Sequence, residues 1–154
     1  MSDDRVTVLL VEDDDVDAEA VIRSIRRSQV PVDVVWVEDG LEALDVLRGQ
    51  HSSRTVERPV IVLLDLNMPR MTGFEFLASM RQDPLLKAAI VFVLTASDCL
   101  RDISEAYDCQ AVGYLVKSRL GTEYELLADL LQAYYQTVDF PAPARITVTL
   151  CAPQ

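Results

Sequence analysis

Polar side chains follow four apolar runs of the sequence, at the positions where strands would end. Glu12 and Asp13 come after V-T-V-L-L-V, and Asp65 comes after V-I-V-L-L. Thr95 follows I-V-F-V-L, and Lys117 follows G-Y-L-V. The carboxyl ends of parallel strands meet at one edge of a sheet, where folds of this kind bind their ligands. These side chains are therefore predicted to form one site.

The carboxylates of this set predict a magnesium site. Carboxylates packed together repel one another when they are ionised, and a divalent cation relieves that repulsion. Mg²⁺ takes oxygen ligands, keeps several of its waters and needs only a few protein groups. We expect Asp13 and Asp65 to bind it directly, together with the backbone carbonyl of Asn67, whereas Glu12 would act through a water molecule.

Asp65 would be the reactive group of the site. Aspartate carboxylates attack phosphorus and form aspartyl phosphates, and a bound metal offsets the repulsion between such a nucleophile and an incoming phosphoryl group. Lys117 would then pair with phosphoryl oxygens, and Thr95 would donate a hydrogen bond to one of them. Each residue alone could have an ordinary structural role, so the prediction depends on their joint placement.

The elements that must position these residues are indicated by apolar periodicity. Short runs that mostly lack alternation are typical of strands covered on both faces, and here they cover residues 6–11, 32–37, 60–64, 90–94 and 113–116. Helical patterns lie between them. We expect Ser97 or Asp98 to be the N-cap of the fourth helix and residues 121–138 to form the last helix.

Alternation of strands and helices predicts an α/β fold in which helices cover both faces of a parallel sheet. Five strands fit a flavodoxin-like, doubly wound sheet in the order 2-1-3-4-5. We expect one domain over residues 1–138 and a C-terminal extension over residues 139–154.

Composition narrows the class of protein. The formal net charge of −11 argues against nucleic-acid binding, which needs a basic face. No apolar run approaches the roughly 18 residues that a membrane span requires, and the start M-S-D-D-R does not resemble a signal peptide. Three cysteines without a C-x-x-C pair suit reduced thiols. We therefore expect a cytoplasmic protein that binds neither nucleic acid nor membrane.

Motifs in order resemble the receiver domains of two-component response regulators over about residues 5–137: L-L-V-E-D-D, L-L-D-L-N-M-P-R-M-T-G, V-L-T-A-S-D and G-Y-L-V-K. The resemblance implies that Asp65 is the phospho-acceptor, that Glu12 and Asp13 are the acidic pair and that Thr95 and Lys117 are the switch residues. Tyr114 falls at the family's rotameric aromatic position.

One residue departs from the family pattern. Ser118 stands where the switch lysine is usually followed by a proline in a cis peptide bond. A cis bond before another residue costs about 2.5–4 kcal/mol, so the bond is either cis and strained or relaxed to trans, and the position of Lys117 depends on which. A second resemblance, through D-P-L-L, T-A-S-D, R-D-I-S-E-A-Y-D and L-V-K-S, is to single-domain regulators paired with phytochrome histidine kinases.

These resemblances imply a single-domain response regulator rather than an enzyme. A sensor histidine kinase, with a bacterial phytochrome as the candidate, would phosphorylate Asp65, and a conformational switch would change protein contacts. The alternative is a phosphate sink or shuttle. A phosphatase of the haloacid-dehalogenase type is disfavoured because Asn67 stands where its acid/base aspartate would be. A binding protein that no longer accepts phosphate is disfavoured because the residues for phosphorylation are present.

The last helix and the tail suggest a homodimer. The helix carries more apolar residues than one core-facing stripe needs: Leu126, Leu127, Leu130, Leu131, Tyr134, Tyr135 and Val138. After Pro141 and Pro143, the run R-I-T-V-T-L alternates like a strand. We expect this arm and the last helix to pack on a second copy of the chain, with a disordered tail as the alternative.

Overall fold

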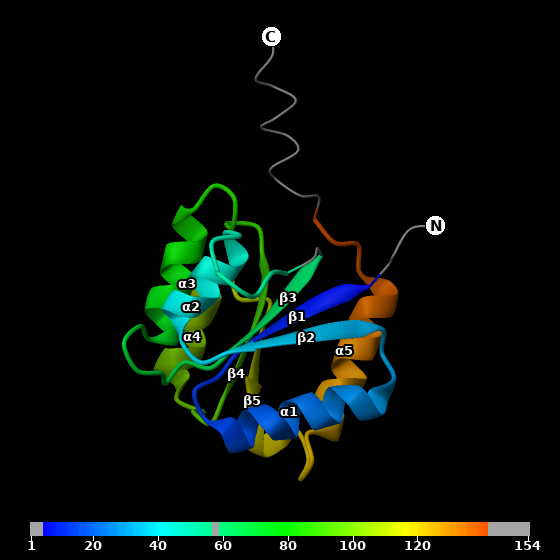
Figure 1. The fold of residues 1–154 in the computed structure, drawn as a ribbon. Coiled ribbons are helices and arrows are strands. Elements are labelled where there is room, and N and C mark those ends of the chain that lie inside the picture. Colours follow the sequence, from blue (N-terminus) through cyan, green and yellow to red (C-terminus); the bar gives the residue numbers. More distant parts are fainter. Residues whose placement is uncertain (1–4, 57–58, 142–154) are drawn as a thin grey trace.

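The computed structural model describes residues 5–56 and 59–141. Strands and helices alternate along the chain, and all strand pairs are parallel (Figure 1). The strands are β1 (Val6–Val11), β2 (Val32–Val37), β3 (Val60–Leu64), β4 (Ile90–Thr95) and β5 (Gly113–Val116). Their order is β2-β1-β3-β4-β5, which confirms the predicted doubly wound, flavodoxin-like sheet.

Helices cover both faces of the sheet. They are α1 (Asp15–Ser28), α2 (Gly40–Leu47), α3 (Gly73–Gln82), α4 (Leu100–Asp108) and α5 (Glu125–Thr137), with a short 3₁₀ turn at Lys117–Arg119. Figure 1 shows α1 and α5 on one face and α2, α3 and α4 on the other. No helix within residues 5–56 and 59–141 has the length and apolar character needed to cross a membrane.

The two faces bury separate cores, which explains why the central strands are apolar throughout. Every residue of β1 is buried. Val8 and Leu10 face the core under α1 and α5, whereas Leu9 and Val11 face the core under α2 and α3. Because each residue of a central strand meets one core or the other, the side chains before the strand ends are almost all apolar, and Thr7 near the start of β1 is the exception in that strand.

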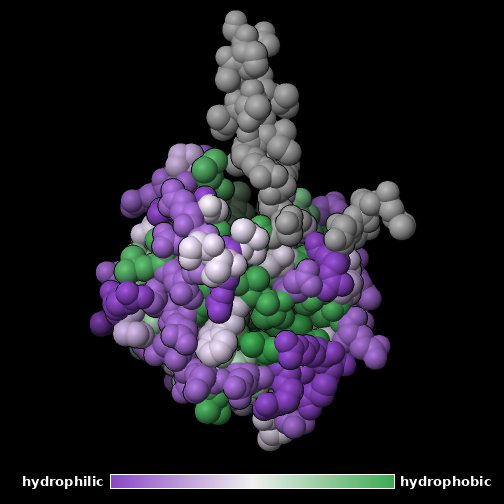
Figure 2. Space-filling view, viewed as in Figure 1, coloured by the Kyte–Doolittle hydropathy of each residue, from purple (hydrophilic) through white to green (hydrophobic). Residues whose placement is uncertain are grey.

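The edge strand β2 is less enclosed than the central strands. Val34, Val35 and Trp36 are only half-buried, since β2 pairs on one side alone. Figure 2 shows apolar residues gathered over this part of the molecule, amid a surface that is otherwise largely hydrophilic. The loop after α2 covers part of the edge, where Arg54 donates a hydrogen bond to the carbonyl of Trp36.

Two predicted helix boundaries are wrong. The N-cap of α4 is Cys99, not Ser97 or Asp98, because the Ser97 hydroxyl is used differently: it accepts from the Cys99 N–H and donates to Asp102. The last helix begins at Glu125 rather than at residue 121. Gly121 (φ 91°) and Tyr124 (φ 56°) have left-handed backbone conformations that cannot continue a right-handed helix.

Fewer apolar residues of α5 lie outside its core-facing stripe than the sequence predicted. Leu127 and Leu131 are buried, whereas Leu126 is 52% exposed. Three more residues are partly buried and pack on the same core as the buried pair: Leu130, Tyr134 and Tyr135. After the helix, the Phe140 ring meets the Tyr134 ring edge-on at 6.0 Å. The alternating run at residues 145–150 lies outside the described residues.

Candidate functional site

The sheet register brings the predicted acidic residues together. Val11 of β1 lies opposite Leu64 of β3, so the next residues, Glu12 and Asp65, emerge side by side. The Asp65 N–H donates to the Val11 carbonyl at 3.0 Å, and this bond continues the ladder. Carboxylate oxygens of Glu12, Asp13 and Asp65 lie within 4.8 Å of one another. The group is built only of hard oxygen donors, which suits a divalent cation.

The three carboxylates differ in what they already bind. Glu12 is buried, and its two oxygens accept from the Lys117 ammonium at 2.8 Å and from the Asp14 N–H at 3.2 Å. Asp13 is exposed, and its carboxylate has no hydrogen bond or ion pair with another residue in the part of the chain that the structure describes. Asp13 is therefore freer than Glu12 to bind a cation directly.

Burial and the neighbouring charges shift the pKa of Glu12, and that of Lys117, in opposite directions. Burial raises the pKa of Glu12 from 4.5 to about 8, with a further rise from the Asp65 charge, while Lys117 opposes the shift. Burial lowers the pKa of Lys117, but hydrogen bonds to Asp17 and Glu12 outweigh it, and the pKa of the lysine is raised overall. Lys117 is therefore positively charged at neutral pH.

The Asp65 carboxylate is held on both sides. One oxygen accepts from the Thr95 hydroxyl at 3.1 Å and from the Asn67 N–H at 3.3 Å. The other oxygen lies 3.8 Å from the Lys117 ammonium. Asp65 is 7% exposed, so the carboxylate is oriented by its neighbours and can still be approached from outside.

The start of α3 packs closely against the segment that follows Asp65, and this explains why residue 73 is a glycine. A Cβ atom at this position would lie 2.5 Å from the Asp65 carbonyl and 2.6 Å from the Leu66 Cα, closer than any side chain permits. Thr72 caps α3 through its hydroxyl. The glycine therefore lets the helix fix the loop that carries Asn67, whose side chain is exposed.

Thr95 and Tyr114 are joined by a short segment after β4. The Thr95 hydroxyl reaches Asp65, and two residues later the Ser97 carbonyl accepts a hydrogen bond from the Tyr114 hydroxyl at 3.0 Å. Tyr114 is half-buried against a small core that includes Leu66. Thr95 and Tyr114 are therefore linked through the segment that follows β4.

Asp17 belongs to this site although its spacing gave no reason to select it. Its carboxylate accepts from the Lys117 ammonium at 2.8 Å. In the sequence, Asp17 is one of a run of acids at the start of α1, where the helix dipole favours acids in any case. Only the placement of Lys117 beside that helix distinguishes it from the others.

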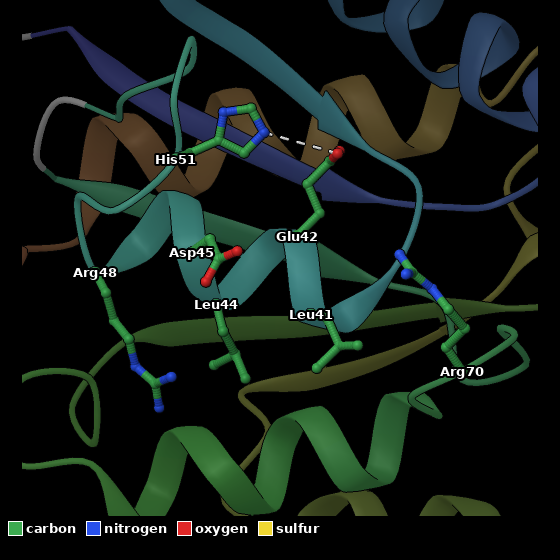
Figure 3. Close-up of a pocket in the computed structure, with 7 residues that line it drawn as sticks. All are labelled: Leu41, Glu42, Leu44, Asp45, Arg48, His51 and Arg70. Atoms are coloured by element: carbon green, nitrogen blue, oxygen red, sulfur yellow. Dashed lines mark ion pairs between the residues drawn. The ribbon is translucent and has the colours of Figure 1, made fainter.

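A hollow elsewhere on the molecule contains none of these residues. It has a volume of about 470 Å³ and lies along α2 (Figure 3). Several of its polar side chains contact one another or a neighbour: the His51 ring lies 3.7 Å from Glu42, and Arg48 pairs with Asp83 at 3.0 Å. The predicted site residues lie at the carboxyl edge of the sheet instead, and that edge is the candidate functional site.

Known proteins share both the sequence and the fold. Residues 8–129 match the response regulator receiver domain family. The response regulator Rcp1 of Synechocystis sp. is 35% identical over 136 residues, which cover 88% of this chain and 92% of that protein.

Two solved structures extend the likeness to three dimensions. The Mn²⁺-bound form of Rcp1 has a TM-score of 0.78 at 34% identity and covers 88% of this chain and 99% of that one. The phosphorylated cyanobacterial phytochrome response regulator RcpA has a TM-score of 0.78 at 33% identity and covers 88% of this chain and 98% of that one. Together with the acidic cluster, these matches show that the chain belongs to the response regulator receiver domain family of two-component signalling.

Proposed function

We propose that the protein is a response regulator that accepts a phosphoryl group on Asp65 from a sensor histidine kinase in the cytoplasm, in a reaction that requires Mg²⁺. The observation that carries the proposal is the arrangement around Asp65. Its carboxylate accepts from Thr95 on one oxygen and faces the Lys117 ammonium at 3.8 Å on the other, within an acidic cluster. This set supplies a nucleophile, a hydroxyl donor and a balancing charge.

Transfer of the phosphoryl group is a displacement at phosphorus. An Asp65 oxygen forms a bond to phosphorus, the phosphorus–nitrogen bond of the kinase phosphohistidine breaks, and its electron pair returns to the imidazole. A bound Mg²⁺ would offset the charge repulsion during this step. Asp13, Asp65 and the Asn67 carbonyl are the proposed direct ligands, with Glu12 acting through water. Lys117 and Thr95 would bind phosphoryl oxygens.

The proposed signal passes through Thr95, Ser97 and Tyr114. A phosphoryl oxygen on Asp65 would compete for the Thr95 hydroxyl, and the Ser97 carbonyl would carry the shift to the Tyr114 hydroxyl. The surface of α4 beyond these residues exposes Leu100 (80%) and Tyr107 (50%). We propose that this surface of α4 is the contact region for a partner, which the switch would alter.

A phytochrome histidine kinase is the proposed source of the phosphoryl group. The support is the likeness to RcpA, which is a phytochrome response regulator, and to Rcp1. The test is a phosphotransfer assay with an autophosphorylated bacterial phytochrome and, as the control, an unrelated histidine kinase. Transfer should be faster from the phytochrome. Equal rates from both kinases would remove the support for this input.

We further propose that residues 1–138 form the receiver domain and that residues 139–154 form an arm that joins α5 in a homodimer. The support is the exposed Leu126 and the packing of Phe140 along α5 on Tyr134. Truncation after Thr137 should convert a dimer into a monomer in light scattering. A monomeric full-length protein at tens of micromolar, or a truncated form that dimerises equally well, would refute the arm.

Phosphorylation itself is tested with acetyl phosphate and Mg²⁺, followed by intact mass measurement. The wild-type protein should gain one acid-labile phosphoryl group, and Asp65→Asn should gain none while it unfolds at a similar or slightly higher temperature, because like-charge repulsion is relieved. Omission of Mg²⁺ should also prevent the gain. Phosphate retained by Asp65→Asn would assign the acceptor to another residue.

A further inference from the structure

Asp17 connects the first turn of α1 to the lysine of the site. Its carboxylate accepts from the Lys117 ammonium at 2.8 Å, and residues 17 and 117 lie on different elements. The backbone at Asp17 is fixed, because its N–H donates to the N-cap side chain of Asp14 at 3.1 Å. The Lys117 side chain is 10% exposed and that of Asp17 is 35% exposed. This contact therefore fixes the lysine from the helix side.

The ammonium has three N–H donors, and the structure shows how they are used. Glu12 and Asp17 each accept one at 2.8 Å. The nearer oxygen of Asp65 is 3.8 Å away, beyond the length of a hydrogen bond. The third N–H is thus not taken by Asp65, although the two groups carry opposite charges. A group bound to Asp65 could supply the missing acceptor without displacing the lysine.

Glu12 alone would not keep the ammonium at this distance. Glu12 and Asp65 follow neighbouring strands at the same level of the sheet, so a lysine bound to Glu12 can approach Asp65 as well. Asp17 comes from α1, which covers one face of the sheet, and attracts the ammonium toward that side. Opposite charges a few ångströms apart in a largely buried site attract strongly, so a contact of this kind is needed to oppose a direct pair.

We infer that Asp17 is a positioning residue. It holds the Lys117 ammonium too far from Asp65 for a direct hydrogen bond, so that the ammonium can bind an oxygen of a phosphoryl group on Asp65 instead. The inference rests on the proposed function, since it concerns the phosphoryl group that Asp65 would accept. Without Asp17, the ammonium would move about 1 Å and hydrogen-bond the Asp65 carboxylate directly. A carboxylate bound in this way is a weaker nucleophile, and the lysine would occupy space that the phosphoryl oxygens need.

The experiment compares Asp17→Ala with Asp15→Ala. Asp15 is also an exposed acid in the first turn of α1, so the control makes the same charge change without touching Lys117. Acetyl phosphate is varied at saturating Mg²⁺, and Mg²⁺ binding and thermal unfolding are measured for each variant. Asp17→Ala should lower the limiting phosphorylation rate severalfold with little change in the half-saturating donor concentration, and Asp15→Ala should leave both close to wild type.

Two further measurements separate positioning from a general structural role. Asp17→Asn keeps an acceptor without its charge and should give an intermediate rate. A crystal structure of metal-free Asp17→Ala should show the Lys117 ammonium at hydrogen-bond distance from Asp65, roughly 3 Å, in place of 3.8 Å.

Several results would overturn the inference. Faster phosphorylation of Asp17→Ala would mean that Asp17 competes with the phosphoryl group for the lysine. An equal loss in Asp15→Ala would mean that only the total charge matters. If the wild-type protein accepts no phosphoryl group, the proposed function has failed. The crystal structure still decides on Asp17 in that case, because an unchanged distance between Lys117 and Asp65 would refute its positioning role.

Discussion

Buried Lys117 and half-buried Arg81 are cations at opposite edges of the sheet, and they have different kinds of partner. Lys117 lies at the carboxyl edge among the carboxylates of Glu12, Asp17 and Asp65. Arg81, on α3, donates four bonds of 2.9 Å to backbone carbonyls in the loops before β4 and β5: those of Lys87, Ala89, Cys109 and Gln110.

The difference separates a group that can exchange partners from one that cannot. Backbone carbonyls are fixed by the loops that carry them, so the Arg81 contacts change only if those loops move. The partners of Lys117 are side chains, and one of them is beyond hydrogen-bond distance. Burial lowers the pKa of Arg81, whereas the carboxylates raise that of Lys117. We interpret Arg81 as a structural clamp and Lys117 as a group placed to meet an added negative charge.

The largest effect is expected from Lys117→Met. This change removes the balancing charge beside Asp65, so phosphorylation by acetyl phosphate should slow by about tenfold or more. The same change leaves three carboxylates without a cation, so Mg²⁺ should bind more tightly. Calorimetric titration with Mg²⁺ and intact mass measured over time check both effects. Weaker Mg²⁺ binding or an unchanged rate would contradict the role given to the lysine.

A smaller effect, on stability alone, is expected from Arg81→Met. The change leaves four carbonyls without their donor, and the free energy of unfolding should fall by about 2–3 kcal/mol. The phosphorylation rate should stay near that of wild type, because the clamp lies at the other edge of the sheet. Urea unfolding provides the measurement, with the exposed Arg23→Met as the matched control. Equal stability in the two variants would mean that the clamp contributes little.

The last effect is a pH dependence of the metal-free protein. Because burial raises the pKa of Glu12 from 4.5 to about 8, the folded state binds a proton there more tightly than the unfolded state does. This group therefore contributes stability that is fully present below about pH 4.5 and is lost as the pH rises to about 8.

Thermal unfolding in a chelator across this pH range should show the loss as a decrease in Tm. Glu12→Gln cannot titrate and should have a flatter profile than wild type. If the two profiles have the same slope, the proton is bound at another residue.

The sequence was sufficient to predict the strands and the residues that follow them. A parallel sheet with fixed register places the residue after each strand at a known edge, so Asp65 and Glu12 could be located without any side-chain detail. The apolar runs identified where the strands end because the buried strands of this fold are apolar almost throughout, with Thr7 in β1 as an exception.

Features that depend on side-chain conformation or on local backbone could not be predicted in the same way. The contact of Asp17 with Lys117 joins residues 100 positions apart, and nothing in an acidic helix start indicates which acid will meet the lysine. The late start of α5 follows from the left-handed conformation of Tyr124, which a tyrosine does not signal. The predicted N-cap of α4 was wrong because the Ser97 hydroxyl donates to Asp102 instead.

The most direct test of the account is a crystal structure of the protein with Mg²⁺ and beryllofluoride, a mimic of the phosphoryl group. The account predicts beryllofluoride on Asp65, with fluorine atoms accepting from the Lys117 ammonium and the Thr95 hydroxyl, and with the four Arg81 contacts unchanged. Beryllofluoride bound away from Asp65, or bound there with Lys117 turned away from it, would contradict the account.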